Sequence, residues 1–261
     1  MPRERLDKKL LELGFASSRE KAQALIMSGL VVVDGHIVDK PGFLVKEGQR
    51  IEVKETMRYV SRGGYKLEHV LERFKVDVKG LVALDVGSST GGFTDCLLQK
   101  GALKVYAVDV GRAQMDMKLR KDPRVILYEE TDARSLTEEH IPQKVDIITV
   151  DVSFISLTKI LSHVLKFLKD DGIALILVKP QFELTPEKVR KGVVRDPKDK
   201  AYAVLKVCKH LNELGFNVGG VIKSKPKGSK GNEEFFVLAG RHLIQIKEIE
   251  KAIEDAVREP I

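Results

Sequence analysis

A glycine- and serine-rich segment, Gly87-Ser88-Ser89-Thr90-Gly91-Gly92-Phe93, directly follows the apolar run Leu84-Asp85-Val86. This order predicts a buried strand, a tight turn and the start of a helix. Glycines in such a turn let a ligand approach the backbone, and the first N–H groups of a helix attract anionic groups. The segment has neither the ending of a P-loop nor the spacing of a dinucleotide fingerprint. The candidate ligand-binding residues of this segment are Asp85, Gly87, Ser89, Gly91, Gly92 and Phe93.

Two further acids stand where the next strands are expected to end. Asp109 follows the apolar run 105–108, and Asp132 follows the run 125–128. An acid at the end of the second strand can hydrogen-bond a ribose diol, and the third acid would lie at an adenine edge. These acids after a glycine turn predict a nucleoside ligand without a pyrophosphate, and therefore S-adenosylmethionine. The alternative is that they are ordinary solvated turn residues.

Asp151 and Lys179 form a second candidate constellation. Asp151 follows the run 146–150 and Lys179 follows the run 173–178. In open parallel sheets the carboxyl ends of the strands face the ligand crevice, so both side chains should face the reacting group. Loss of hydration at the end of a buried strand favours the neutral amine, which can accept a proton. A purely structural salt bridge is the alternative.

Elements that alternate between strand and helix must position these residues. Such alternation predicts an α/β fold with a mainly parallel sheet covered by helices. The expected strands are 81–86, 104–108, 125–128, 146–150, 173–178, 216–223 and 235–240. The expected helices are 92–100, 114–120, 155–168 and 201–214, with a helical pattern in 242–258 and a loop over 183–200.

A smaller pattern precedes a change of composition near residues 55–62. Helical spacing of leucines predicts a helix that starts at Leu6 and stops at Gly14, and Ser17 or Ser18 can cap a second helix. Asp34-Gly35 between two valine- and isoleucine-rich runs predicts a hairpin, and 51–53 reads as a further strand. We therefore expect a small N-terminal α+β domain over residues 1–58.

The net charge of the chain is +7, and its distribution is uneven. Residues 181–240 carry 12 Lys or Arg and 7 Asp or Glu, a balance that suits a phosphate backbone, although ordinary solvated loops are the alternative. The candidate phosphate contacts are Lys188, Arg190, Lys191, Arg195, Lys223, Lys225, Lys227 and Lys230.

Composition also excludes several classes of protein. The longest apolar run is far shorter than the roughly 20 residues of a membrane helix, and the charged N-terminal residues do not resemble a signal peptide. Two cysteines cannot form a disulfide scaffold, and the cysteines and six histidines lack metal-ligand spacing. We expect a cytoplasmic protein without a metal or a membrane partner.

Five segments resemble the FtsJ-type RNA ribose methyltransferases. They are residues 81–94, 105–109, 146–156, 174–183 and 231–238. This resemblance implies a Rossmann-like sheet that binds S-adenosylmethionine and releases S-adenosylhomocysteine.

Residues 5–53 resemble the RNA-binding domain first seen in ribosomal protein S-four, through Ser18-Arg19, Val33-Asp34-Gly35 and Lys40-Pro41-Gly42. Both domains in this order, joined by Tyr59-Val60-Ser61-Arg62-Gly63-Gly64-Tyr65-Lys66-Leu67, are similar to the haemolysin A family of ribosomal RNA methyltransferases. The resemblance implies an RNA-binding domain over 1–58 and a methyltransferase domain over 59–261, with 59–66 as a linker that carries a catalytic lysine.

The same resemblance implies a Lys-Asp-Lys-Glu tetrad for 2′-O-methylation, matched by Lys66, Asp151, Lys179 and Glu234, with Glu233 as an alternative to the last. It further implies transfer to a ribose 2′-OH of a cytidine, with ribosomal RNA and ribosomal subunits as partners. Two other hypotheses stay open. One is the membrane-lytic activity that the family name suggests, and the other is a non-catalytic RNA-binding assembly factor.

Overall fold

The structure is a computed structural model that describes residues 3–53 and 58–260. The chain forms two compact units, Met1–Arg62 and Gly63–Ile261, and each is described by itself. Part of the composition change near 55–62 falls on residues 54–57, which lie outside the described residues. The stretch 59–66, expected to be a linker, overlaps the first turn of a helix, so that Lys66 is held on regular structure.

The N-terminal unit is a small α+β structure with its own apolar core. Its elements are β1 Arg3–Arg5, α1 Leu6–Glu12, α2 Arg19–Met27, β2 Val31–Val33, β3 His36–Ile37, β4 Leu44–Lys46 and β5 Ile51–Val53. Strands β3, β2 and β5 form an antiparallel sheet, and β1 pairs with β4. The hydroxyl of Ser18 accepts from the Lys21 N–H at 3.3 Å and caps α2, as one of the two predicted caps.

A buried carboxylate connects the two helices of this unit. Asp7 is fully buried on α1, and it accepts hydrogen bonds from Arg5 on one side and from Arg19 and Gln23 of α2 on the other, at 2.9–3.1 Å. The hydrogen bonds from Arg5 hold the pKa of the Asp7 carboxyl well below its usual range. The charge is thus stabilised by partners that also fix how α1 and α2 pack.

The C-terminal unit is built on a seven-stranded sheet. Its strands are β6 Val82–Val86, β7 Lys104–Val108, β8 Val125–Tyr128, β9 Val145–Val150, β10 Leu168–Val178, β11 Asn217–Lys223 and β12 Phe235–Gly240. Their order is β11-β12-β10-β9-β6-β7-β8, and only β12 runs against the others. The strand order reverses between β6 and β9, and open parallel sheets bind ligands at such a point.

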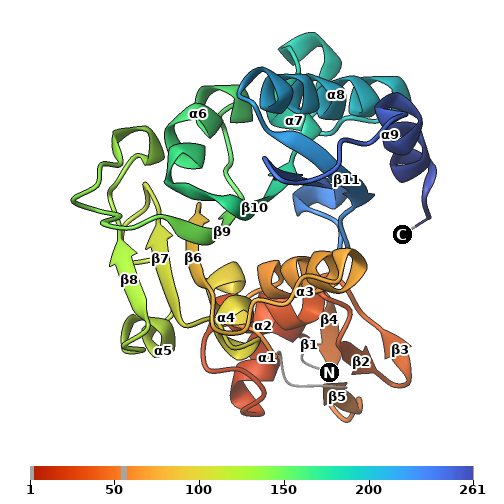
Figure 1. Ribbon diagram of the computed structural model, residues 1–261. Helices are drawn as coiled ribbons and strands as arrows, with labels where there is room; N and C mark the ends of the chain where they lie inside the picture. The colour runs from red at the N-terminus through yellow and green to blue at the C-terminus, as the bar shows by residue number, and fades with distance from the viewer. Residues whose placement is uncertain (1–2, 54–57, 261) are drawn as a thin grey trace. The chain divides into compact units, whose positions relative to one another are not determined.

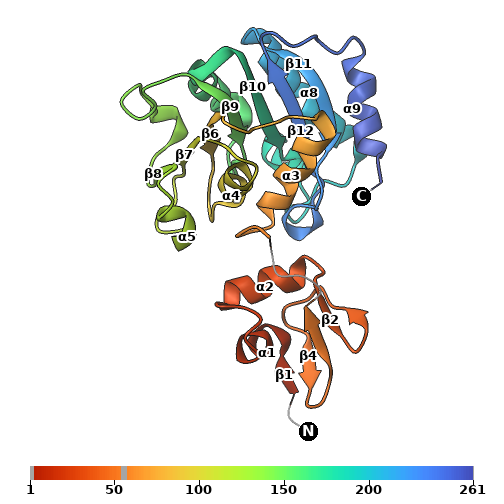
Figure 2. The same cartoon turned by 60° about the horizontal axis from the view of Figure 1, so that its bottom comes forward.

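Helices cover both faces of this sheet (Figures 1 and 2). One face carries α3 Gly63–Phe74 and α4 Gly92–Gln99, which pack against each other; the other carries α6 Leu161–Val164 and α8 Pro197–Glu213. Beside α8, α9 Ile249–Arg258 packs on the edge strand β11. The remaining helical elements are α5 Met117–Arg120, α7 Pro180–Glu183 and short 3-10 turns at 133–135, 157–159, 165–167, 186–188 and 229–231. This confirms the mainly parallel α/β sheet expected from the alternating pattern and the Rossmann-like arrangement that the family resemblance implies.

All seven strands expected in this unit are confirmed, whereas three expected helical segments were too long. The pattern in 242–258 forms a helix only from Ile249, and α8 begins at Pro197, inside the expected loop 183–200. The predicted helix 114–120 begins only at Met117, because the Glu129 carboxylate accepts from the Gln114 N–H at 3.0 Å and Asp116 caps the short helix α5. The predicted helix 155–168 is replaced by a 3-10 turn at Leu157–Lys159, the short helix α6 and a second 3-10 turn at Leu165–Phe167.

Among the described strands and α-helices, β1, β4, α3 and the single-turn helix α7 were missed by the sequence analysis. Strands β1 and β4 are only three residues long and carry little pattern. Helix α3 had a usable signal, since Leu67, Val70 and Leu71 are buried at helical spacing.

The Asp7 cluster predicts a pH-dependent contribution to the stability of the N-terminal unit. We expect Asp7→Asn to destabilise this unit by about 1–2 kcal/mol at pH 7, because the amide cannot replace a carboxylate between two guanidinium groups that are partly solvated. The pKa of Asp7 is lower in the folded protein than in the unfolded chain, where it is about 3.9, so the ionised carboxylate stabilises the fold above that pH. This stabilisation is lost as the pH falls from about 3.9 toward the lower pKa of the folded state. Hydrogen exchange of the α1 and α2 amides should therefore show a difference at pH 7 that shrinks below pH 4.

Asp39→Asn is the matched control, since Asp39 is exposed in the same unit. Its effect should stay within about 0.5 kcal/mol. Equal effects of the two substitutions would contradict a structural role for the Asp7 carboxylate.

Candidate functional site

The turn after β6 packs closely against the segment after β9. Gly87 has a φ of +83°, and a Cβ atom there would lie 2.3 Å from the carbonyl oxygen of Asp151. Gly91 has a φ of +95°, and a Cβ atom there would lie 2.2 Å from a methyl carbon of Leu119. Only glycine combines this conformation with this space. The two glycines thus allow the β6 turn to close on its neighbours at the reversal of strand order.

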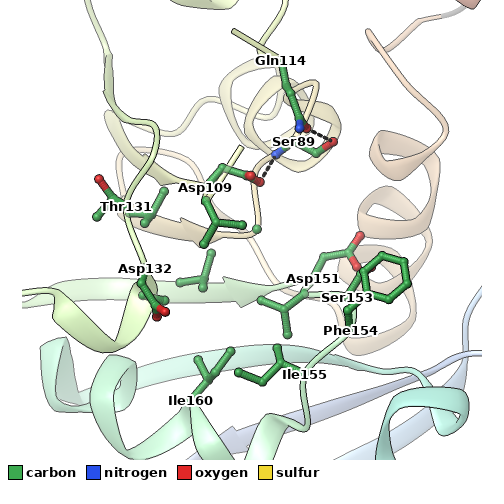
Figure 3. A pocket seen from close by; sticks show the side chains of 16 residues that line it. Ser89, Asp109, Gln114, Thr131, Asp132, Asp151, Ser153, Phe154, Ile155 and Ile160 are labelled. Atoms are coloured by element: carbon green, nitrogen blue, oxygen red, sulfur yellow. Dashed lines mark hydrogen bonds between the residues drawn. The ribbon is translucent and has the colours of Figure 1, made fainter. Parts of the chain in front are cut away.

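Asp109, at the end of β7, organises this turn from the other side. Its carboxylate accepts from the Ser89 N–H at 2.7 Å (Figure 3). It also accepts from the Gly111 N–H at 2.7 Å. The Ser89 hydroxyl lies 3.2 Å from the Gln114 side-chain oxygen. A carboxylate offers about four lone-pair sites, so two backbone bonds leave Asp109 able to accept from a ligand as well.

A cavity of about 360 Å³ lies between the ends of β6, β7 and β9 (Figure 3). Its lining includes four predicted cofactor residues, Gly87, Ser89, Asp109 and Asp132. The other lining residues are Val86, Val108, Val110, Gln114, Thr131, Ala133, Asp151, Val152, Ser153, Phe154, Ile155 and Ile160. A mainly apolar wall with a few convergent polar groups is typical of a small-molecule site.

Asp132 supplies a fixed negative charge at this cavity. Its carboxylate accepts from the Arg134 backbone and pairs with the Arg134 guanidinium at 2.6 Å. The hydrogen bond from that side chain lowers the pKa of Asp132 to about 2, so the group is ionised at neutral pH. Acidic groups at the ends of β7 and β8 beside apolar walls fit the diol and the aromatic base of a nucleoside.

Four predicted cofactor residues lie outside the lining of this cavity. Asp85 is fully buried, and its carboxylate accepts from the hydroxyls of Thr94 on α4 at 2.7 Å and Thr149 on β9 at 2.8 Å. Gly91 precedes α4 and Gly92 begins it. Phe93 packs on the ring of Phe236, with 6.0 Å between centroids. In this structure the four hold together the elements around the cavity.

Several lining residues escaped the sequence analysis. Gln114, Ile155 and Ile160 were assigned to helices that are shorter or broken in the structure. Phe154 has a φ of +65° and is 91% exposed, with its ring 5.0 Å from that of Phe182. The available sequence signal was its position three residues after Asp151, just beyond the expected end of a strand.

The four residues expected to form a tetrad occur as two ion pairs. Lys179 Nζ lies 2.6 Å from Asp151 Oδ1 and donates to the Ser153 hydroxyl at 2.9 Å. Because Asp151 and Ser153 both line the cavity, the Lys179 ammonium lies at its margin. Lys66 Nζ, on α3, lies 2.6 Å from Glu234 Oε2, and both side chains are buried.

Strand register brings the two pairs to one edge of the sheet. Val178, the last residue of β10, is paired with Phe235, the first residue of β12. Lys179 and Glu234 are the next residues outward from this pair, and Asp151 follows the neighbouring strand β9. The antiparallel course of β12 is therefore what carries Glu234 to the edge where β9 and β10 end.

The structure separates the two candidate glutamates. Glu234 pairs with Lys66, whereas Glu233 points to Lys200 at 2.7 Å and lies 3.6 Å from Lys223 and 3.9 Å from Lys227. Burial raises the pKa of Glu233, but the ammonium groups, that of Lys200 above all, outweigh it and lower the pKa overall. This geometry favours Glu234 as the fourth member of the set.

Glu183 connects the two loops that carry Asp151 and Lys179. Its buried carboxylate accepts from the Leu157 N–H at 2.7 Å and from the Ser156 hydroxyl at 2.5 Å. Lys206 of α8 donates to the same carboxylate at 3.3 Å. The loop after β9 is thereby fixed to α7, the helix that directly follows Lys179.

Within the described ranges 3–53 and 58–260, no cluster of three His, Cys, Asp or Glu side chains could hold a metal ion. In the same ranges, none of the helices has the length and apolar character needed to cross a bilayer.

Asp85 predicts a pH-dependent effect of its own. Burial raises the pKa of Asp85 to about 6, so folding disfavours the ionised group, and the wild type loses stability as the pH rises from about 4 to 6. Asp85→Asn removes this titration. The free energy of unfolding of this variant, relative to that of wild type, should therefore rise by up to about 3 kcal/mol over that interval. The loss of one acceptor for the two threonines lowers it by an amount that does not depend on pH.

Urea unfolding of both proteins at pH 4, 5, 6 and 7 measures this difference. A substitution that destabilises the protein at pH 7 as much as at pH 4 would contradict a buried charge at Asp85.

Comparison with known families gives two matches along the chain. The FtsJ-like methyltransferase family matches residues 59–241, and the S4 domain matches residues 4–51. The small ribosomal subunit protein uS4 of Dehalococcoides mccartyi is 46% identical over 54 residues, 21% of this chain and 26% of that protein.

Several proteins are similar over nearly the whole chain. The 16S/23S rRNA (cytidine-2′-O)-methyltransferase TlyA of Mycobacterium tuberculosis is 41% identical, over 99% of this chain and 97% of its own. Hemolysin A of Brachyspira hyodysenteriae is 40% identical, over 88% and 97%.

Among solved structures, a hemolysin candidate from Streptococcus thermophilus superposes with a TM-score of 0.76 at 39% identity, over 98% of this chain and 96% of its own. A structure of an S-adenosylmethionine-dependent methyltransferase candidate from Listeria monocytogenes shares the fold at a TM-score of 0.50 and 18% identity, over 67% and 97%. With the FtsJ-like match spanning most of its length and an S4 domain ahead of it, this chain belongs to the FtsJ-like methyltransferase family.

Proposed function

We propose that this protein transfers the methyl group of S-adenosylmethionine to a ribose 2′-OH of ribosomal RNA, with a cytidine as the target nucleoside. The observation that carries the proposal is the Lys179–Asp151 pair at the margin of a nucleoside-sized cavity. The 41% identity to an rRNA (cytidine-2′-O)-methyltransferase over nearly the full length supports the substrate and the position of transfer. A ribosomal RNA substrate agrees with the cytoplasmic location expected from the sequence.

The residues around the cavity fit S-adenosylmethionine. Asp109 has free acceptor sites for a ribose diol, Asp132 is a fixed anion beside apolar walls, and the turn at Gly87 and Ser89 lines the part of the cavity left for the amino-acid group. When bound, the cofactor supplies a methyl group on a positively charged sulfur. Asp85, Gly91, Gly92 and Phe93 would support the cofactor indirectly, by holding β6, β9 and α4 in place.

In the proposed reaction, the 2′-oxygen forms a bond to the methyl carbon while the bond from that carbon to sulfur breaks and its electron pair stays on sulfur. Lys179 takes the hydroxyl proton. To accept that proton, Lys179 must be present as the neutral amine, which alone carries a free lone pair. Asp151 then orients the neutral amine, and the Lys66–Glu234 pair fixes the adjacent strand end.

These features favour an enzyme over the two other hypotheses. A non-catalytic assembly factor would not require two buried or half-buried ion pairs of catalytic residue types beside a cofactor cavity. Relatives named hemolysin share the same fold as the methyltransferase relatives. None of the contacts around the cavity suggests lytic chemistry.

Lys179→Arg tests the proposed base. Arginine keeps the charge and can still pair with Asp151, but it does not give up its proton near neutral pH. We expect the methyl transfer rate to fall at least 100-fold while the dissociation constant for S-adenosylmethionine changes less than threefold. Single-turnover assays on ribosomal RNA measure the rate, and resistance of the product to alkaline cleavage maps the methylated ribose.

Lys200→Arg is the matched control, because Lys200 forms an ion pair of similar length and equal side-chain exposure with Glu233. It should keep activity near that of wild type. Activity of Lys179→Arg within tenfold of wild type, equivalent to about 1.4 kcal/mol of barrier, would remove Lys179 from the role of base. A wild-type protein that methylates no ribosomal RNA would refute the function itself.

We further propose that residues 1–58 act as a separate RNA-binding domain, supported by the S4 match and by the independent core of this unit. Deletion of these residues should raise the KM for ribosomal RNA at least tenfold and leave the affinity for S-adenosylmethionine unchanged. A thermal melt of the 59–261 fragment checks its folding. An unchanged KM would assign the small domain another role.

A further inference from the structure

Eight basic residues in the segments that lead to α8 and β12 were expected from sequence to face RNA phosphates. The structure divides these eight residues into two groups by whether they have a partner within the protein. Four of them already have partners within the protein. Lys188 pairs with Asp199 at 2.6 Å, Lys225 with Glu259 at 3.8 Å and Lys227 with Glu233 at 3.9 Å. Lys223 is buried and donates to two backbone carbonyls at the end of α9. Each of these four cations therefore has a partner in the protein, within hydrogen-bond distance for Lys188 and Lys223 and near 4 Å for Lys225 and Lys227.

The other four are Arg190, Lys191, Arg195 and Lys230. All four are exposed, and among the residues that the structure describes none of them has a carboxylate within 4 Å. A surface cation without an internal partner keeps its full attraction for an external anion. We name these four residues the basic platform.

A buried asparagine holds the two loops of the basic platform together. Asn232 is 3% exposed, and its side-chain amide donates to the Gly192 carbonyl at 2.8 Å and accepts from the Val194 N–H at 3.3 Å. Its backbone carbonyl accepts from the Gly228 N–H at 2.9 Å. A Cβ atom on Gly192 would lie 3.2 Å from Lys230 Nζ, so this ammonium lies against the other loop. The four cations therefore belong to one fixed surface.

This surface lies at the same edge of the sheet as the two ion pairs. The first loop follows α7, which starts directly after Lys179 at the end of β10. The second loop joins β11 to β12 and ends at Glu234. Asn232 is thus two residues from the carboxylate that pairs with Lys66.

We propose that the basic platform binds the phosphate backbone of the substrate RNA beside the ribose that is methylated, with Asn232 setting the position of the four cations. This inference rests on the proposed function. A ribose that reaches Lys179 brings its neighbouring phosphates to this edge of the sheet, and four unpaired cations match a run of such phosphates in charge. A long-range field alone would not need them fixed by a buried asparagine.

The experiment compares two full-length variants that lose the same charge. The platform variant replaces all four cations by glutamine, as Arg190→Gln, Lys191→Gln, Arg195→Gln and Lys230→Gln. The control variant carries Lys75→Gln, Lys79→Gln, Lys121→Gln and Lys247→Gln. The control lysines lie at the surface, have no carboxylate partner in the described part of the chain, and lie near the opposite edge of the sheet.

The probe is ribosomal subunits from cells in which this gene is deleted. Filter binding at several salt concentrations and methyl transfer at saturating S-adenosylmethionine are measured for both variants and wild type. The platform variant should raise KM at least tenfold and change kcat less than threefold. Its slope of log affinity against log salt should fall by about 3, since each lost phosphate contact removes roughly 0.7–0.9. The control variant should stay within twofold of wild type in KM.

Equal KM values and equal salt slopes for the two variants would overturn the proposal and leave an acidic protein segment as the partner of this surface. A loss confined to kcat or to cofactor affinity would overturn it as well, because the cations would then act on the catalytic site. Absence of methyl transfer by the wild type would instead refute the proposed function, and the salt slopes would still decide whether the platform binds RNA.

Discussion

The close approach of Gly87 to the Asp151 carbonyl is the constraint on which the rest of the site depends. It joins the turn after β6 to the loop after β9 where the strand order reverses, and any side chain at Gly87 would push the two apart. The cavity lies between these segments, and Asp151 holds Lys179 at its margin. One backbone contact thereby relates the position of a cofactor to that of the proposed base.

The buried polar groups around this contact have structural partners of their own. Asp85 connects β6 to α4 and β9 through two threonines, and Glu183 connects the loop after β9 to α7 and α8. Neither carboxylate lines the cavity. A buried carboxylate needs several hydrogen bonds to offset its lost hydration, and here those bonds run between different elements. The same bonds that keep the charges tolerable therefore also fix the loops.

Strand pattern in the sequence was enough to predict the sheet, because seven apolar runs separated by helical stretches allow few other arrangements. It could not predict that residues 155–168 form two 3-10 turns around the short helix α6 in place of one continuous helix. From sequence Glu234 was the first match and Glu233 the alternative. Only the structure separates them, because Glu234 pairs with Lys66 and Glu233 pairs with Lys200. That distinction depends on α3, a helix whose apolar spacing was present in the sequence but was missed.

The reversed strand β12 explains how two ion pairs from distant parts of the chain come to the same edge of the sheet. In a fully parallel sheet, the residue before a strand lies at the edge opposite to the residues that follow the other strands. Because β12 runs against β10, Glu234 lies beside Lys179, and the loop before it reaches the same edge with Lys230 and Asn232. A single reversal thus places the Lys66–Glu234 pair and the basic platform at the edge where the cavity opens. The proposed chemistry and the proposed RNA contacts both depend on this feature of the topology.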